Sequence, residues 1–307
     1  MNDQEFKEKY DKLKYSKFYQ QKMFGWRPLP TISCITIIFV CFAIFFIIMG
    51  IIILVFTAQV KEFKYKYYPC GNNPCPSPLF LNIKEDMKKP FMIYYQVDGI
   101  IQNHRFYMDS KSDKQLKGED YLPDDLKKDK ICESALTKGD IPWQNNNINN
   151  DDIANPCGLI SKTFLNDRFY DWKIDGDTAI EEESEEEIQE IAYKSDIDTY
   201  KGVKENEVLG KNYQHFLVWM RPSPFSNPRK LWGRINKDIK QNSELAVKID
   251  YNYNYPFYSN RYIILSTRNI FGGKSMFLGI CYIIAGGLSL MASVIFITTY
   301  SSFHRKN

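Results

Sequence analysis

Cys157 is the residue best suited to chemistry in the stretch NPCGLISKTFLND, residues 155–167. A cysteine can be a nucleophile, a metal ligand or half of a disulfide, and its compartment and neighbours decide which. The chain contains seven cysteines. Three lie inside long apolar stretches, and the other four lie between those stretches: Cys70, Cys75, Cys132 and Cys157. The nature of the apolar stretches therefore decides the chemistry of the cysteines.

Residues 32–56 and residues 276–300 contain no charged side chain. Both stretches exceed the roughly 20 residues that an α-helix needs to cross a bilayer. A helix buried in a soluble core usually keeps one polar face, and these stretches have none. The first also begins too far from the N-terminus for an ordinary signal peptide. We therefore predict two transmembrane helices in contact with membrane lipids.

Basic residues stand on the outer side of both predicted helices. The first helix is preceded by Lys7, Lys9, Lys12, Lys14, Lys17, Lys22 and Arg27, and the second is followed by Arg305 and Lys306. Because basic segments next to a membrane stay in the cytosol, we predict cytosolic tails of residues 1–31 and 301–307. Residues 57–275 would form one ectodomain, either in the lumen of the secretory pathway or outside the cell.

The four cysteines of this ectodomain are expected to form disulfides, because the compartment is oxidising and their number is even. Three pairings are possible in principle. The short turn CGNNPC favours Cys70–Cys75, which leaves Cys132–Cys157. A zinc site is disfavoured because no Cys-x-x-Cys pair or neighbouring histidine is present. We predict that Cys157 is structural, with neither metal nor cofactor bound to the chain.

Catalytic patterns are absent from the sequence. His104 and His215 are isolated, and no nucleophile elbow, zinc-protease motif or phosphate-binding glycine loop occurs. A dyad of His104 with Cys157 would need a free thiol. The acidic run at residues 181–187 is typical of a solvated loop. A net charge of +3 does not suggest nucleic-acid binding. We therefore predict a non-enzymatic protein.

The ectodomain is expected to be rich in antiparallel β-structure. Residues 90–97 and 215–220 are aromatic and β-branched enough to predict buried strands. Residues 244–257 alternate apolar and polar positions, which predicts a half-buried strand. Residues 261–267 follow closely enough to be its hairpin partner. Helices are expected to be few and short.

The predicted transmembrane helices contain no ionisable side chain of the kind that lines a transport pathway. The second has small residues one turn apart at Ala285, Ser289 and Ser293, with Gly286 and Gly287 beside them. Such a face lets another helix approach closely. That neighbour is either the first helix of this chain or a helix of a partner, and both can hold.

Five motifs, in order, resemble the cell division control protein 50 family. They are QQKMFGWRPLPT before the first helix, YQVDGIIQNHRFY, PCGLISKTFLND, HFLVWMRPSPFSNPRKLWGRI, and GGKSMFLGICYIIAGG at the second helix. The chain departs from the family pattern at Ser161, Lys162 and Thr163, where Ala-Asn-Ser is usual, and at Phe106, where Arg is common. It also has fewer cysteines in the first cluster. The resemblance covers nearly the whole chain.

This resemblance implies a non-catalytic β-subunit of a type IV P-type ATPase, a phospholipid flippase. It implies a sandwich-like ectodomain that caps the luminal loops of the ATPase in a heterodimer. The cytosolic tail, around Trp26 and Arg27, would also contact the ATPase. Family members are needed for the folding of the ATPase, its exit from the endoplasmic reticulum and its activity. The expected location is the endoplasmic reticulum, Golgi, endosome or plasma membrane.

Two other classes of protein fit parts of the sequence. A ligand-gated channel subunit can also have two helices, cytosolic ends and a disulfide-bonded ectodomain. A channel needs polar or charged rings in its pore, and these helices offer mainly Ser289, Ser293, Thr298 and Thr299. A surface adhesion or receptor module is the second alternative, and it predicts a soluble ligand instead of a membrane partner.

Overall fold

A computed structural model describes the chain from residue 3 to residue 306. It does not describe residues 24, 26–30, 69–74, 76, 121–125, 127–131, 145–150, 179–190 and 254–258. The chain divides into two compact units. One consists of Met1–Ile52 together with Phe277–Asn307, and we call the other, Ile53–Met276, the β-rich unit.

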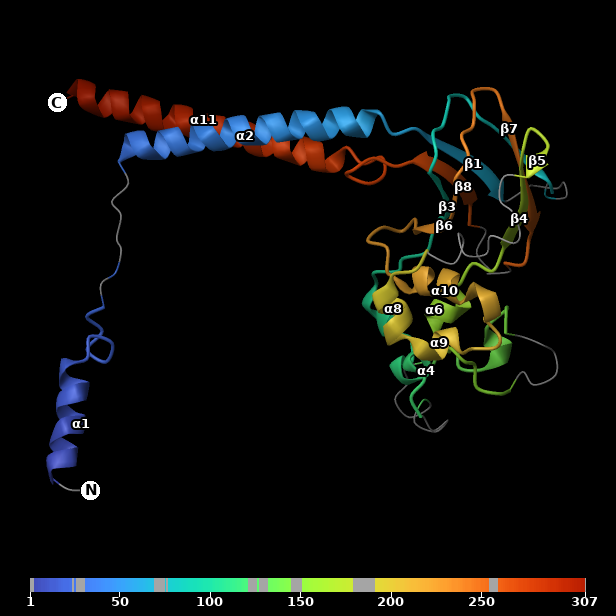
Figure 1. The fold of residues 1–307 in the computed structure, drawn as a ribbon, viewed down its shortest axis with the longest axis horizontal. Coiled ribbons are helices and arrows are strands. Elements are labelled where there is room, and N and C mark those ends of the chain that lie inside the picture. Colours follow the sequence, from blue (N-terminus) through green and yellow to red (C-terminus); the bar gives the residue numbers. More distant parts are fainter. Residues whose placement is uncertain are drawn as a thin grey trace. The chain divides into compact units, whose positions relative to one another are not determined.

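The first unit contains α1 (Asp3–Tyr15) and most of the two long helices, α2 (Ile32–Ala58) and α11 (Phe277–Lys306). Helices α2 and α11 lie side by side over much of their length (Figure 1). Each is long and apolar enough to cross a membrane, with mean hydropathies of 3.4 and 2.3 over their most apolar windows. These helices coincide closely with the two stretches predicted from the sequence.

Small residues form part of the contact between α2 and α11, together with the aromatic pairs Phe39–Phe296 and Phe46–Tyr282. A Cβ atom on Gly50 would lie 2.7 Å from Cγ1 of Ile283, so the helices approach each other closely at this point. A Cβ atom on Gly286 would lie 2.7 Å from Cγ1 of Ile47. Ser293, seven residues further along α11, is also buried. In lipid the hydrophobic effect does not drive helices together, so they associate through close van der Waals packing, which small residues allow.

Replacing Gly286 by Val is expected to destabilise the α2–α11 pair by about 1–3 kcal/mol, because an added side chain overfills a packed contact. Gly287 is the matched control, since a Cβ atom there would meet nothing within 4 Å. The measurement is the thermal unfolding midpoint of each full-length variant in mild detergent. Equal losses at the two glycines would contradict this packing, because both positions share the same change in helix propensity.

The β-rich unit contains two antiparallel four-stranded sheets (Figure 1). The first has the order β1-β8-β3-β6 and the second β2-β7-β4-β5. The strand bounds are β1 (Glu62–Tyr68), β2 (Leu79–Asn82), β3 (Phe91–Val97), β4 (Arg168–Ile174), β5 (Asp177–Thr178), β6 (Arg229–Ile235), β7 (Glu244–Asp250) and β8 (Arg261–Thr267). The predicted fold class, two long apolar helices flanking antiparallel sheets, is confirmed.

One hydrophobic core joins the two sheets. It contains Ile93 and Leu265 from the first sheet, and Leu245, Val247 and Trp172 from the second. Strand β3 is buried along nearly its whole length, as its aromatic and β-branched sequence predicts. In β7 the apolar residues Leu245 and Val247 alternate with half-buried positions, so the predicted period of two is confirmed, but the strand ends at Asp250.

Two predictions about strands are wrong. Residues 215–220 lie in helix α10 (Tyr213–Met220) and not in a strand. This run is short and buried on several sides, so its apolar residues have no period that separates helix from strand. The expected hairpin between β7 and β8 does not form, because β7 pairs with β2 and β4 while β8 pairs with β1 and β3. Each is an interior strand of a different sheet.

Short helices pack together beside the strands. Their bounds are α3 (Arg105–Asp109), α4 (Asp113–Lys117), η1 (Lys138–Asp140), α6 (Leu159–Lys162), α8 (Lys194–Thr199), α9 (Lys201–Lys204), η2 (Gly210–Asn212) and α10. They are short, as predicted, but more numerous within the described residues than the sequence suggested. Helix α10 reaches the first sheet, where the ring of Trp219 stacks on Tyr95 with centroids 6.2 Å apart.

Candidate functional site

The segment of residues 155–167 is mostly buried within the β-rich unit. Cys157 is bonded to Cys132, with Cα atoms 5.7 Å apart, and both residues are buried. They share a small apolar cluster with Ala135, Ile141 and Ala154. The disulfide therefore anchors the start of this segment to a part of the chain that forms no strand.

Two buried glutamines hold the backbone around Cys157. Gln115 donates to the carbonyl of Ala154 at 2.9 Å and accepts from the N–H of Cys157 at 3.0 Å. Gln144 makes the corresponding bonds with residues 155–156, at 3.0 and 2.9 Å. A buried amide that donates and accepts in this way satisfies backbone groups that no strand or helix pairs. The two glutamines thus replace secondary structure at this place.

Gly158 makes a close backbone contact. Its φ is +98°, and an added Cβ atom would lie 2.1 Å from the carbonyl oxygen of Ser110. The next residue, Leu159, donates its N–H to Oγ of Ser110 at 3.0 Å. Only glycine fits this combination of a left-handed conformation and a closely packed neighbour. Steric restriction therefore explains why glycine follows Cys157 in the motif.

Two tryptophans bind the carbonyls of helix α6. The indole N–H of Trp219 donates to Ile160 at 3.1 Å, and that of Trp143 donates to Ser161 at 2.7 Å. Trp219 belongs to α10, so two of the motifs that were separate in the sequence contact each other here. These bonds add indole donors to two carbonyls of the last turn of this short helix.

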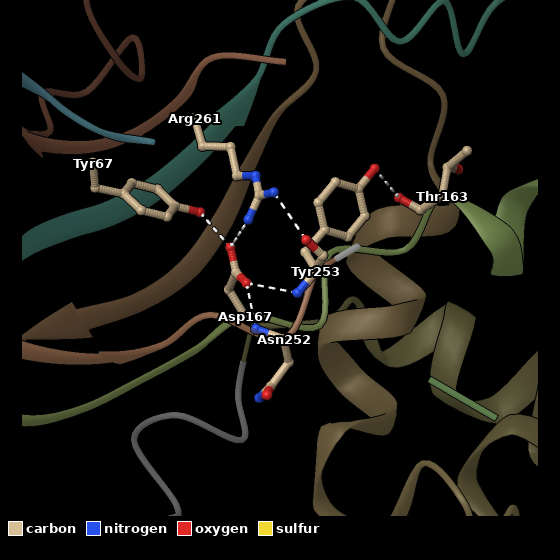
Figure 2. A network of polar contacts seen from close by, with 6 residues as sticks. All are labelled: Tyr67, Thr163, Asp167, Asn252, Tyr253 and Arg261. Atoms are coloured by element: carbon tan, nitrogen blue, oxygen red, sulfur yellow. Dashed lines mark hydrogen bonds and ion pairs between the residues drawn. The ribbon is translucent and has the colours of Figure 1, made fainter. Parts of the chain in front are cut away.

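Asp167, the last residue of the segment, lies in a buried polar network (Figure 2). Its Oδ2 atom is 2.8 Å from Nη1 of Arg261, and the side chains are 0% and 2% exposed. The hydroxyl of Tyr67 donates to the same oxygen at 3.0 Å. The backbone N–H groups of Asn252 and Tyr253 donate to Oδ1, each at 2.9 Å. The carboxylate therefore has four donors and no contact with water.

The guanidinium of Arg261 is also well enclosed. It donates to the carbonyl of Tyr253 at 2.9 Å and lies 3.8 Å from the ring centroid of Tyr68. Burial, and then the nearby Asp167 carboxylate, raise the pKa of the Tyr67 hydroxyl well above its usual value. The Tyr67 hydroxyl thus stays protonated and keeps donating. The network joins β1 and β8 of one sheet to the start of β4 and the end of β7 in the other.

Tyr253 extends the network toward the helices. Its hydroxyl donates to the carbonyl of Thr163 at 3.4 Å (Figure 2). In addition, Oγ1 of Thr163 is 2.6 Å from the hydroxyl of Tyr107 in α3. Thr163 is one of the residues at which the chain departs from the family pattern. Its hydroxyl is hydrogen-bonded in this structure. The segment 155–167 thus contacts both sheets and the helices through polar groups.

Two adjacent segments outside this network expose apolar side chains, and we call them the loop surface. They are residues 99–106, a loop and the first residues of α3, and residues 221–227. Their backbones are joined, since the N–H groups of residues 99–100 donate to the carbonyl of Ser226 at 3.0 and 3.1 Å. The loops expose Ile101 (55%), Phe106 (60%) and Phe225 (75%). An ordered surface with several large exposed apolar side chains is typical of an interaction site.

Comparison with known proteins identifies the family of this chain. A sequence profile of the LEM3 (ligand-effect modulator 3) family / CDC50 family matches residues 53–306. This chain is a member of the LEM3/CDC50 family. The match includes the β-rich unit and helix α11, so the segment 155–167, the buried network and the loop surface all lie within it.

Relatives of this LEM3/CDC50 chain cover almost its full length. It is 29% identical to "ALA-interacting subunit 3" of Arabidopsis thaliana, over 94% of this chain and 86% of that protein. It is 27% identical to "Cell cycle control protein 50A" of Mus musculus, over 91% and 86% of the two chains. It is 26% identical to "Cell cycle control protein 50B" of Homo sapiens, over 92% of each.

The predicted site residues do not form one site in the structure. Cys132 and Cys157 are joined, which leaves no thiol for a dyad with His104. Cys75 is disulfide-bonded, whereas Cys70 lies outside the described residues. The acidic run at residues 181–187 lies outside them as well. Within the described part of the chain, no group of three or more His, Cys, Asp or Glu side chains could hold a metal ion.

The predicted partner contacts are also separate. Trp26 and Arg27 lie outside the described residues. In α11, Ser293 is buried in the unit that α11 forms with α2, whereas Ala285 and Ser289 are partly buried. Gly286, between them, lies in close contact with Ile47 of α2. The alternative of packing against the first helix of the chain therefore accounts for part of this small-residue face.

Sequence reasoning did not find the roles of Gln115, Gln144 and Arg261. No local pattern marks a glutamine that bonds backbone more than ten residues away. Arg261 is the first residue of a strand whose other residues are mostly buried. This position was the feature of the sequence that could have indicated a buried ion pair. A charged residue that opens a buried strand needs a partner of opposite charge. Asp167, at the end of the motif, is that partner.

Proposed function

We propose that this chain is the accessory β-subunit of a type IV P-type ATPase that moves phospholipid. The observation that carries the proposal is its similarity, over more than nine-tenths of its length, to relatives whose names describe interacting subunits. The sequence motifs imply the same role. On this proposal the ATPase performs ATP hydrolysis and lipid movement. The subunit supports the folding of the ATPase, its exit from the endoplasmic reticulum and its activity.

The composition of the two long helices supports a non-catalytic role. Neither α2 nor the apolar part of α11 contains Asp, Glu, Lys, Arg or His. Moving a polar headgroup across roughly 30 Å of hydrocarbon needs polar or charged groups along the way. Two such helices are suited to anchoring and to packing beside a larger membrane domain. This favours one subunit paired with one ATPase over a channel built from several copies.

We infer that the loop surface contacts the luminal side of the ATPase. The hydrogen bond from Nδ2 of Asn103 to the carbonyl of Pro224, at 2.8 Å, adds to the bonds that already join the two loops. Binding through pre-ordered loops loses little conformational entropy. Both loops come from motifs that carry the family resemblance. Cytosolic termini, and contacts through Trp26, Arg27, Ala285, Ser289 and Ser293, are further parts of this proposal.

Replacing Phe225 by Ser is expected to reduce co-purification of the ATPase by about tenfold or more, since a buried aromatic anchor contributes on the order of 2 kcal/mol to an interface. Phe80 is the matched control. It is also an exposed phenylalanine of the β-rich unit, at 57%, but it lies in the second sheet, away from the loop surface. Phe80→Ser is expected to leave co-purification unchanged.

The measurement is quantitative mass spectrometry of proteins retained by the tagged full-length chain in mild detergent. Depletion of the chain is expected to retain the ATPase in the endoplasmic reticulum and to abolish its lipid-stimulated ATP hydrolysis. Purification as a homotrimer that conducts ions in liposomes would refute the subunit proposal and favour the channel. A normal ATPase yield with Phe225→Ser would reject only the loop surface as the contact.

A further inference from the structure

Helix α1 has its apolar residues on one face. Within Asp3–Tyr15, Phe6, Tyr10 and Leu13 are four and three residues apart, so they lie one above the other along the helix. All three side chains are exposed to solvent, at 57%, 56% and 42%. We call this the α1 apolar face. The ammonium of Lys14, from the same helix, lies 5.8 Å from the ring centroid of Tyr10 and leaves the face largely exposed.

The charged residues of α1 are sorted around this face. Lys9 borders it on one side, and Lys7 and Lys14 border it on the other, as their spacing from Tyr10 shows. The opposite side of the helix contains Lys12 and three acidic residues, Glu5, Glu8 and Asp11. Asp3 is the exception, because it stands seven residues before Tyr10 and therefore lies at the edge of the apolar face in the first turn. Lysines otherwise border the apolar face, and Glu5, Glu8 and Asp11 point away from it.

We propose that α1 lies in the plane of the membrane surface, with Phe6, Tyr10 and Leu13 among the lipid headgroups and its bordering lysines on anionic phospholipid. A long lysine side chain can lie along an apolar surface and keep its ammonium group in water. Lysines beside an apolar face suit a flat surface of apolar chains under negative headgroups. Acidic side chains on the far side of the helix then remain in water, away from the lipid phosphates.

The position of α1 in the chain favours a membrane as its occupant. Residues 16–31 join α1 to α2 and can span at most about 55 Å when fully extended. If α2 crosses the membrane, α1 cannot diffuse away from the surface. Tethering makes the contact intramolecular, so even three apolar side chains suffice for substantial occupancy. Lys17 and Lys22 follow in the same linker and add positive charge.

A short helix also gains order from such a contact. Helices of about 12 to 15 residues are only marginally stable alone in water. A surface that binds one face stabilises the helical conformation along with the contact. The inference needs only that α2 spans a membrane, and it does not depend on the ATPase.

Hydrogen exchange of the full-length chain in nanodiscs tests the proposal. One preparation contains phosphatidylcholine alone, and the other contains phosphatidylcholine mixed with phosphatidylserine. Amides of residues 3–15 are expected to exchange more slowly on the anionic nanodiscs, by roughly fivefold for each lysine in contact, and the difference should shrink in high salt.

Two matched pairs of variants separate the contact from helix stability. Tyr10→Ser removes a residue of the α1 apolar face, while Tyr15→Ser makes the same change on the opposite side. Lys14→Glu reverses a bordering charge, while Lys12→Glu reverses one on the far side. Tyr10→Ser and Lys14→Glu are expected to restore fast exchange on anionic nanodiscs. Tyr15→Ser and Lys12→Glu are expected to retain most of the protection.

Equal exchange on the two lipid compositions would overturn the proposal. So would equal effects of the two members of each pair, since that result would reflect helix stability alone. Protection that arises only when a type IV P-type ATPase is added would assign the face to a protein contact. Co-purification of the ATPase is a separate measurement, so failure here would leave the proposed function in place.

Discussion

Replacing Asp167 by Asn is expected to lower the free energy of unfolding of the β-rich unit by about 3–5 kcal/mol. The change leaves the Arg261 guanidinium buried, 2% exposed at its side chain, without its counter-charge. A buried charge without a partner costs much more than a lost hydrogen bond. Most domains are stable by only about 5–15 kcal/mol, so this single change removes a large share of the total.

Guanidinium denaturation of the full-length chain in detergent, followed by tryptophan fluorescence, measures this loss. Asp171→Asn is the matched control, because Asp171 is paired with Lys173 and Lys248 near the surface, at 3.2 and 2.8 Å. Exposed ion pairs contribute little to stability, so its unfolding midpoint should hardly move. A similar small shift for Asp167→Asn would show that the buried pair does not hold the two sheets together.

Removing the hydroxyl of Tyr67 is a milder change to the same network. Removing it in Tyr67→Phe takes away one of four donors to the Asp167 carboxylate and leaves the charges paired, so a loss near 1 kcal/mol is expected. The contrast between the two variants separates the effect of charge from that of hydrogen bonding. A double substitution at Asp167 and Arg261 should cost less than the two single losses combined, because the two side chains interact.

Patterns that depend on neighbouring residues were readable from the sequence. The two long helices follow from charge-free stretches, and β3 and β7 follow from β-branched content and alternation. Pairing between distant strands was not readable. Strand β8 lies between β1 and β3, and its partners start 199 and 170 residues earlier in the chain by the strand bounds Glu62, Phe91 and Arg261. Nearness in sequence suggested a hairpin with β7, but both strands are interior strands and each already has two partners.

Helix α10 shows a second limit of sequence patterns. Its residues are as apolar and aromatic as those of a strand, and burial alone does not separate the two. The helical form is favoured by tertiary contacts, because Trp219 reaches both the carbonyl of Ile160 and the ring of Tyr95. Such contacts cannot be derived from residues 213–220 alone. The motif that includes this helix was recognisable, but its conformation was not.

The small-residue face of α11 shows a third limit. Spacing identified Ala285, Ser289 and Ser293, with Gly286 beside them, yet the close contacts with α2 are made at Gly286 and at Ile283, which lies against Gly50. Several faces of a helix rich in Gly, Ala and Ser satisfy a spacing rule equally well. The residues that oppose it decide which face is used, and here Ile47 of α2 lies against Gly286. The sequence therefore indicated close helix packing without locating it.

Gly158→Ala is expected to destabilise the β-rich unit by about 4 kcal/mol or more, because strain and overpacking act at the same residue. The new methyl group would lie 2.1 Å from the carbonyl oxygen of Ser110, so the backbone of one segment must move. Movement of Gly158 also displaces Cys157, whose N–H bonds Gln115 and whose sulfur bonds Cys132. The disulfide, the glutamine bridges and the start of α6 are therefore strained together.

Gly176→Ala separates the two causes. Gly176 has a φ of +94°, close to that of Gly158, but an added Cβ atom there would meet nothing within 4 Å. Its cost should be the conformational strain alone, about 1–2 kcal/mol. Denaturation midpoints of the two full-length variants give the difference, which is the effect of the contact with Ser110. If the two alanine variants lose equal stability, the close packing of the Cys-Gly pair is not what fixes this segment. If Gly158→Ala alone also loses its ATPase in co-purification, correct folding of the segment is a condition for assembly.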